Sequence, residues 1–144
     1  MIRKINISDK EFYIKSVKDF YSSEAVLHSI PEANIIKTFD ELMNSENYAQ
    51  CYIFEQDGER AGYALLAKTY SQEAGGTVLW IDEIYILPEF RSKGIGSHFF
   101  KFLKENSNTA RLRLEFCPSN KKAIEIYKRQ GFVPLAYEQM IYEE

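Results

Sequence analysis

The chain has 144 residues, of which 45% are hydrophobic, and a formal net charge of −3. This length can bury one substantial core but is too short for two comfortable domains, so we expect a single domain over residues 1–144. The slightly acidic balance argues against nucleic acid as a partner, because phosphate binding needs a basic face. The two cysteines and two histidines lack metal-ligand spacing, and no metal site is expected.

No apolar run near the N-terminus has the form of a signal peptide, and none elsewhere approaches membrane-spanning length. Cysteine is used sparingly, as in proteins of a reducing compartment. These features predict a cytoplasmic protein that has no membrane partner.

The first third of the chain predicts one strand and two helices. Alternating residues indicate a strand over residues 2–7. Ser8 and Glu11 match a capping box and predict a helix that ends near Tyr21. Pro31 marks the start of a second helix, whose apolar positions recur at helical spacing.

The middle of the chain predicts a hairpin. Residues 48–55 and 60–69 have strand character, and Asp57-Gly58 between them is a typical two-residue turn. The remaining predicted elements are a central strand over 77–87, a helix to about Asn106, a strand over 111–116, a helix over 120–130 that ends at Gly131, and a last strand over 133–142.

A glycine-containing loop follows the central strand. It brings Arg91-x-x-Gly94-x-Gly96 to a helix N-terminus, where unpaired N–H groups and the positive end of the peptide dipoles favour an anion. Glycine also removes the Cβ atoms that would keep an anion at a distance. The residue order fits neither the dinucleotide fingerprint nor the P-loop. The loop alone therefore predicts either a phosphate-bearing ligand of unspecified type or a turn without a ligand.

A second pattern, N-x-x-A-x-x-x-Y-x-x-x-G-F, extends from Asn120 to Phe132. Together with the earlier segment, in which Ile86 replaces the valine of V-x-P-x-x-R-x-x-G-x-G, it resembles the signatures of GNAT-type N-acetyltransferases. The resemblance is specific from Trp80 to Phe132. It implies a mixed α/β domain of element order βααβββαβαβ with a mostly antiparallel central sheet. In that fold the fourth and fifth strands splay apart and acetyl-CoA enters the gap.

The resemblance also implies the cofactor contacts. The loop should present its backbone N–H groups to the pyrophosphate, and the main chain of the central strand should pair with pantetheine like an added strand. Ser92 stands where the family often has glycine, which matters only if the backbone there needs a positive φ. The expected cofactor residues are Ile84, Tyr85, Ile86, Arg91, Ser92, Lys93, Gly94, Ile95, Gly96, Ser97, Asn120 and Tyr127.

Three residues are candidates for catalysis. Tyr127 matches the family's motif tyrosine, to which proton donation to the departing thiolate is commonly assigned; a structural tyrosine is the alternative. Asp82 and Glu83 interrupt an apolar strand, where a carboxylate is costly unless paired or used. Successive strand residues point to opposite faces, so we expect at most one in a given pocket and the other paired with Arg111 or Arg113. A base among the two, a water-mediated base and no base all remain open.

The acidic pair resembles that of diamine and polyamine acetyltransferases. It suggests direct transfer, in a ternary complex, to a small cationic primary amine. The alternatives are a protein N-terminus or lysine as acceptor, and a CoA-binding module without catalysis; a homodimer is consistent with the family. The expected acceptor-site residues are Tyr21, Glu24, His28, Asp82 and Glu83, with Glu32, Tyr137 and Met140 as further wall residues.

Overall fold

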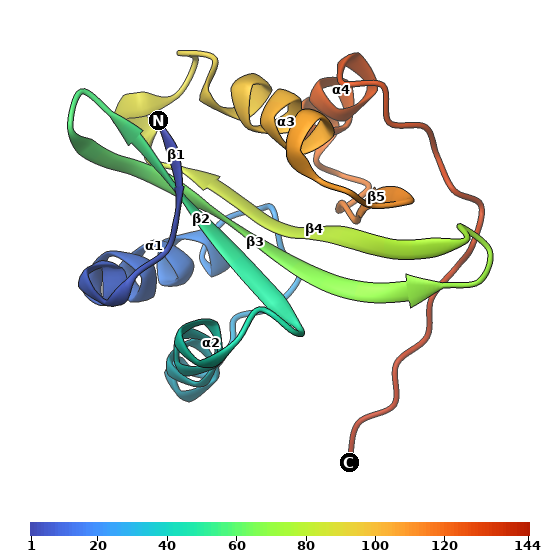
Figure 1. Ribbon diagram of the computed structural model, residues 1–144, viewed down its shortest axis with the longest axis horizontal. Coiled ribbons are helices and arrows are strands. Elements are labelled where there is room, and N and C mark those ends of the chain that lie inside the picture. Colours follow the sequence, from blue (N-terminus) through green and yellow to red (C-terminus); the bar gives the residue numbers. More distant parts are fainter.

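The computed structural model describes residues 1–144 and shows a five-stranded mixed sheet with helices on both faces (Figure 1). Strands β1 to β4 pair antiparallel in sequence order, and β5 joins β4 in parallel. The expected mixed α/β fold is confirmed. The elements are β1 (Ile2–Lys4), η1 (Ile7–Asp9), α1 (Lys10–Tyr21), α2 (Glu32–Asn44), β2 (Ala49–Gln56), β3 (Glu59–Ser71), β4 (Gly76–Ile86), η2 (Pro88–Phe90), α3 (Ile95–Asn106), β5 (Arg111–Leu114) and α4 (Lys121–Arg129).

Two hydrophobic clusters hold the helices on the sheet. Helices α1 and α2 cover one face, and α3 and α4 cover the other (Figure 1). On the first face, Tyr13 of α1 and Phe39 of α2 pack against Tyr63 of β3. On the second, Phe99 and Phe100 of α3 lie in one cluster with strand residues of β2, β3 and β4.

None of the helices combines the length and apolar character that a membrane-spanning segment needs.

The start of α1 differs from the sequence-based expectation. The capping box is formed by Asn6 and Asp9 instead of Ser8 and Glu11, and α1 begins only at Lys10. The Asn6 side chain accepts the Ser8 N–H at 2.9 Å, while the Asn6 N–H donates to Asp9 Oδ2 at 2.9 Å. This shift follows from the charge of Asp9, which is completely buried and bound by arginines of two strands.

The predicted hairpin between β2 and β3 is confirmed. Asp57 and Gly58 both have positive φ, 53° and 80°, as a type I′ turn requires. The later elements also match within a few residues, and Gly131 (φ 90°) ends the α4 region in the left-handed conformation.

The expected strand over residues 133–142 is wrong. The segment after α4 has no regular structure and runs past the sheet to the C-terminus (Figure 1). Alternating apolar residues form a strand only where their backbone finds a partner, and two features prevent this. Pro134 has no N–H to donate, and the Tyr137 hydroxyl donates to Glu73 Oε2 at 2.7 Å, beside the β3–β4 turn. Val133 and Met140 are consequently exposed.

Candidate active site

The sheet opens between β4 and β5. The two strands pair only from Val78↔Arg111 to Ile81↔Leu114, and beyond Ile81 they separate, as the splayed fold predicts. The Leu87 N–H donates to the Ala61 carbonyl of β3 at 2.9 Å. Because main-chain groups alternate sides along a strand, those of Ile84 and Ile86 are directed away from β3 and towards the gap. A strand edge is thus available to an extended ligand.

A β-bulge lies at the start of this gap. In the β3–β4 ladder Leu65 pairs with Glu83 and Leu66 with Ile81, so that Asp82 is an extra residue on β4. Ile81 packs with α3, whereas Glu83 faces α1. Asp82 is the extra residue of the bulge, so the alternation between Ile81 and Glu83 is interrupted, and its charge also helps to raise the pKa of Tyr21 of α1. Both observations place Asp82 on the α1 side. The expectation that only one of the two carboxylates can face a given pocket is therefore wrong.

Glu83 is held by two tyrosine hydroxyls. Tyr63 donates to its Oε1 at 2.6 Å and Tyr21 donates to its Oε2 at 2.9 Å. The side chain is only 7% exposed, and this burial raises the pKa of Glu83 although both hydrogen bonds oppose the rise. Neither arginine of β5 pairs with it, contrary to expectation: Arg111 binds Glu73, and Arg113 stacks on Trp80. Glu83 is thus fixed in place but lacks a counter-ion.

Asp82 is more accessible. Partial loss of water around it, together with the charges of Glu83 and Glu115, raises the pKa of Asp82 to about 6. No hydrogen bond or cation lowers that pKa. Asp82, Glu83 and Glu115 therefore form a group of carboxylates on the α1 side of the gap. Such a group attracts a cation, and Asp82 can accept a proton near neutral pH.

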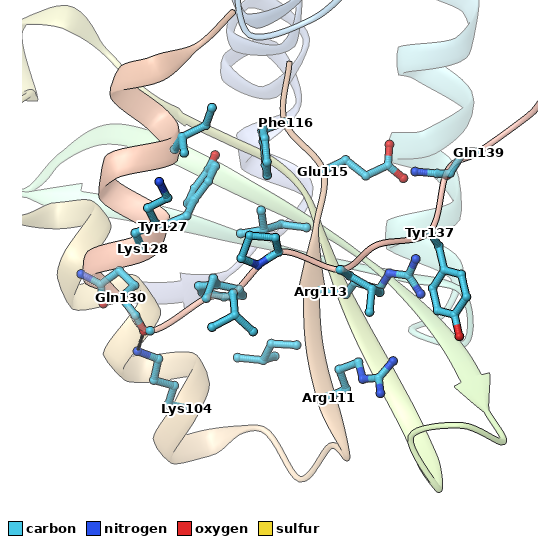
Figure 2. A pocket seen from close by; sticks show the side chains of 18 residues that line it. Lys104, Arg111, Arg113, Glu115, Phe116, Tyr127, Lys128, Gln130, Tyr137 and Gln139 are labelled. Carbon is cyan, nitrogen blue, oxygen red and sulfur yellow. Dashed lines mark hydrogen bonds between the residues drawn. The ribbon is translucent and has the colours of Figure 1, made fainter. Parts of the chain in front are cut away.

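Tyr127 lies on the other side of the gap, on α4. Its ring packs against those of Phe100, Phe116 and Phe132, with centroids 6.1, 6.4 and 6.4 Å away. Figure 2 shows it beside Phe116, at the edge of a pocket bounded by β5, α4 and the C-terminal segment. Burial raises the pKa of Tyr127, so its phenol stays protonated over the physiological range. The ring is fixed while the hydroxyl keeps access to solvent.

The glycine loop ends in an uncapped helix. Gly94 is the N-cap of α3 with φ 79°, and no side chain satisfies the first N–H groups of the helix. A Cβ on Gly96 would meet only Ile86 Cδ1, at 3.8 Å, and φ of Gly96 is not positive. Neither folding nor packing therefore requires glycine at this position. Both observations fit a pyrophosphate held by backbone N–H groups.

Ser92 has φ 62°, a left-handed conformation that costs a non-glycine residue about 1 kcal/mol. The replacement of the family's glycine by Ser92 therefore matters, because the backbone does have a positive φ at this position. We expect Ser92→Gly to increase the free energy of unfolding by about 1 kcal/mol in urea denaturation. The control is Asp57→Gly, where aspartate tolerates its φ of 53° and the gain should be smaller. A destabilised Ser92→Gly would contradict this account.

Three expected cofactor residues are engaged within the protein. Arg91 Nε donates to the Ile86 carbonyl at 2.8 Å, and its guanidinium lies 5.7 Å from the Tyr85 ring, so Arg91 turns back to β4. Tyr85 packs in the α1 cluster and pairs with β3, away from the gap. Asn120 caps α4 by accepting the Ala123 N–H at 3.3 Å. The backbone of the loop and the edge of β4, apart from the Ile86 carbonyl that accepts from Arg91, remain as the accessible ligand-binding groups.

The expected acceptor residues are only partly brought together. Tyr21 joins Asp82 and Glu83, whereas Glu24 and His28 are exposed in the α1–α2 connection. The further wall residues are directed elsewhere: Glu32 pairs with Lys18, Tyr137 bonds Glu73, and Met140 is fully exposed.

Three residues near the site were missed by sequence reasoning: Tyr63, Trp80 and Glu115. None belongs to a motif. Each acquires its neighbours through pairing between distant strands, for which a single sequence carries no local signal.

Comparison with known proteins shows which family has this sequence and fold. Residues 13–132 match the model of the Acetyltransferase (GNAT) family. The mouse protein thialysine N-epsilon-acetyltransferase is 25% identical over 146 residues, covering 90% of this chain and 82% of its own. The bovine protein of that name is 36% identical over 73 residues, covering 49% and 42%.

Solved structures share the fold. A possible acetyltransferase from Clostridium difficile 630 superimposes with a TM-score of 0.86 at 20% identity, covering 100% of this chain and 97% of its own. An aminoglycoside N-acetyltransferase in complex with CoA gives a TM-score of 0.77 at 18% identity, covering 100% and 93%. Because the family model spans most of the chain, the protein belongs to the GNAT acetyltransferase family and is an N-acetyltransferase that uses acetyl-CoA.

Proposed function

We propose that the acceptor is a small cationic primary amine, acetylated directly in a ternary complex. The observation that carries this proposal is the group of carboxylates, Asp82, Glu83 and Glu115, which lacks any protein cation. An ammonium ion is the natural counter-charge for such a group. The relatives support this choice, because their names specify thialysine and aminoglycosides, which are amines of small molecules.

The cofactor and the acceptor approach from opposite faces of the sheet. The N–H groups at the start of α3 hold the pyrophosphate, and the β4 edge at Ile84 and Ile86 orients the pantetheine arm. Bound acetyl-CoA supplies an activated acetyl thioester. The fit rests on the uncapped helix, the open strand edge and the glycine at position 96.

Proton transfer is divided between the two sides of the gap. Asp82 accepts the proton that the acceptor ammonium must lose before its nitrogen can attack. Glu83, fixed by Tyr21 and Tyr63, holds the ammonium beside Asp82. Tyr127 donates a proton to the departing sulfur, because its raised pKa keeps the phenol protonated. The second proton, which the nitrogen loses as the amide forms, restores the phenol, and Asp82 releases the first proton to solvent. The reaction thus uses a base with a pKa near 6 and an acid that stays protonated at pH 7.

The test is release of CoA thiol from acetyl-CoA with a panel of acceptors: diamines, polyamines, lysine-type amino acids, aminoglycosides, and peptides with free N-termini or lysines. We expect turnover with the small cationic amines. Preference for the peptides would favour protein acetylation. Acetyl-CoA binding without turnover of any amine would favour a binding module.

The pH dependence identifies the base. If Asp82 accepts the proton, kcat/KM of the wild type should fall as the pH decreases through about 6, because the protonated carboxyl cannot act as a base. In Asp82→Asn this ascending limb should disappear together with about 100-fold of the rate at pH 7.5. Glu115→Gln is the control: even if it weakens binding of the amine, it should retain the ascending limb and shift it to lower pH, since one neighbouring charge is removed. An unchanged profile in Asp82→Asn would eliminate Asp82 as the base.

A further inference from the structure

A second row of side chains lies next to the carboxylates on the same face of the sheet. Because of the bulge, Glu83 stands opposite Leu65 of β3, and Trp80 stands opposite Ala67. Leu65 and Ala67 are two positions apart on β3, about 6.6 Å along the strand, so their side chains face the same side. Their partners Glu83 and Trp80 therefore also face that side. The Trp80 indole donates to Thr69 Oγ1 at 3.1 Å, which fixes its ring. The Trp80 ring is therefore a fixed surface next to Glu83 on this face of the sheet.

Arg113 lies on that surface. It pairs with Trp80 in the β4–β5 ladder, and its guanidinium carbon is 4.1 Å from the centroid of the indole ring. No carboxylate lies within ion-pair distance of it. The neighbouring Arg111, by contrast, binds Glu73 at 3.0 Å, and Glu73 also accepts the Tyr137 hydroxyl. The guanidinium of Arg113 is thus held in one orientation by Trp80 and forms no ion pair within the protein.

The space around Arg113 is open to a ligand. Arg113 and Glu115 are on the same strand, two residues apart, and both line a pocket of about 720 Å³ with Tyr127. Asp82 and Glu83 do not line this pocket; the connection to them is Glu115, whose charge acts on Asp82. Figure 2 shows Arg111, Arg113 and Tyr137 together on one side of β5, with Glu115 on that side near Gln139.

We propose that Arg113 binds the carboxylate of the acceptor, and that the acceptor is a lysine-type amino acid whose terminal amine reaches Asp82 and Glu83. The proposal rests on the proposed function and specifies its substrate class. A guanidinium suits a carboxylate because its planar N–H groups form paired, charge-assisted hydrogen bonds. The four-carbon stem of lysine allows its carboxylate and its terminal amine to reach neighbouring groups on this face of the sheet. A diamine would place its second ammonium against the like charge of Arg113.

The test compares two acceptors that differ by one group: lysine, and cadaverine, which is lysine without its carboxylate. We expect the wild type to prefer lysine. In Arg113→Gln the KM for lysine should rise at least about 10-fold, with kcat nearly unchanged, because one charged hydrogen-bonding partner is lost. The KM for cadaverine should stay constant or fall. Arg113→Lys should restore part of the preference. Arg111→Gln is the matched control from the same strand and should not change the ratio between the two acceptors.

The possible failures are distinguishable. If Arg113→Gln impairs lysine and cadaverine equally, Arg113 serves only the structure and the proposal is wrong. A wild type that prefers cadaverine also overturns it, while the amine acetyltransferase function stands. If neither acceptor is turned over but another small amine of the panel is, the proposal is wrong and the function stands; if no amine is turned over, the function itself fails. Calorimetric titration of lysine into the CoA complex then decides the role of Arg113: equal binding to wild type and Arg113→Gln would refute it.

Discussion

Tyr127→Phe is expected to lower kcat by about 100-fold or more at pH 7 and to leave the Kd for acetyl-CoA unchanged. General acid catalysis contributes on the order of 10² to 10⁴ in rate, and phenylalanine removes the only group of this side chain that can donate a proton. The loss should depend on the leaving group, because a thiolate that departs more easily needs less help. Stopped-flow measurement of thiol release, with acetyl-CoA and a saturating amine, separates the chemical step from binding.

Phenylalanine at position 127 preserves the packing that fixes the ring. Phe100, Phe116 and Phe132 contact the aromatic body of the tyrosine, and the hydroxyl is not buried without a partner. The Tm should therefore change little. Tyr52→Phe is a suitable control, because Tyr52 packs against Phe99 and Phe102 on the same face and lies on β2, outside the gap. An unchanged kcat in Tyr127→Phe would assign proton donation to another group or to water.

The half of the site that we propose for the cofactor could be predicted from the sequence because its signals are local. A strand, a loop with Gly94 and Gly96 and the first turn of α3 follow one another along the chain. The conformation of each residue depends mainly on its immediate neighbours. The loop and the end of α4 at Gly131 were anticipated for this reason, whereas the separation of β4 from β5 was anticipated from the resemblance to the GNAT fold.

The half that we propose for the acceptor depends on contacts between distant segments. The bulge at Asp82 arises from the register between β3 and β4, and it alone allows Asp82 and Glu83 to face the same side. Glu83 meets Tyr63 and Tyr21 across 20 and 62 residues of sequence. Strict alternation along the strand could not reveal this, because one extra residue inverts the facing of everything beyond it.

The incorrect expectations have a common physical cause. Ser8 and Glu11 match the capping pattern, but the arginines on β1 and β3 draw Asp9 inward and move the start of the helix. Residues 133–142 alternate as a strand would, but the segment is anchored crosswise through Tyr137. In both cases a long-range contact overrides a local preference, which is worth only about 1 kcal/mol.

The largest effect on stability is expected at Asp9. Asp9→Asn should lower the free energy of unfolding at pH 7 by about 3 kcal/mol, because it leaves two arginines facing a neutral group in a buried position. Asp9 is 0% exposed, Arg3 donates to both of its oxygens at 2.8 and 2.9 Å, and Arg60 Nε donates at 2.7 Å. Urea denaturation measures the difference. Glu55→Gln is the control: Glu55 binds the same Arg3 at 2.7 Å but is partly exposed, so its loss should cost less.

The same carboxylate makes stability depend on pH. Burial by itself would raise the pKa of Asp9, but hydrogen bonds from Arg3, the Asn6 N–H and Arg60 outweigh it and lower that pKa to about 2, from 3.8 for an unperturbed aspartate. Because the folded value is the lower one, the stabilisation is complete above about pH 4 and is lost as the pH falls towards 2. It amounts to about 2 kcal/mol. The stability difference between wild type and Asp9→Asn should therefore shrink over this pH range. A constant difference would mean that the effect of Asp9 comes from packing and not from charge.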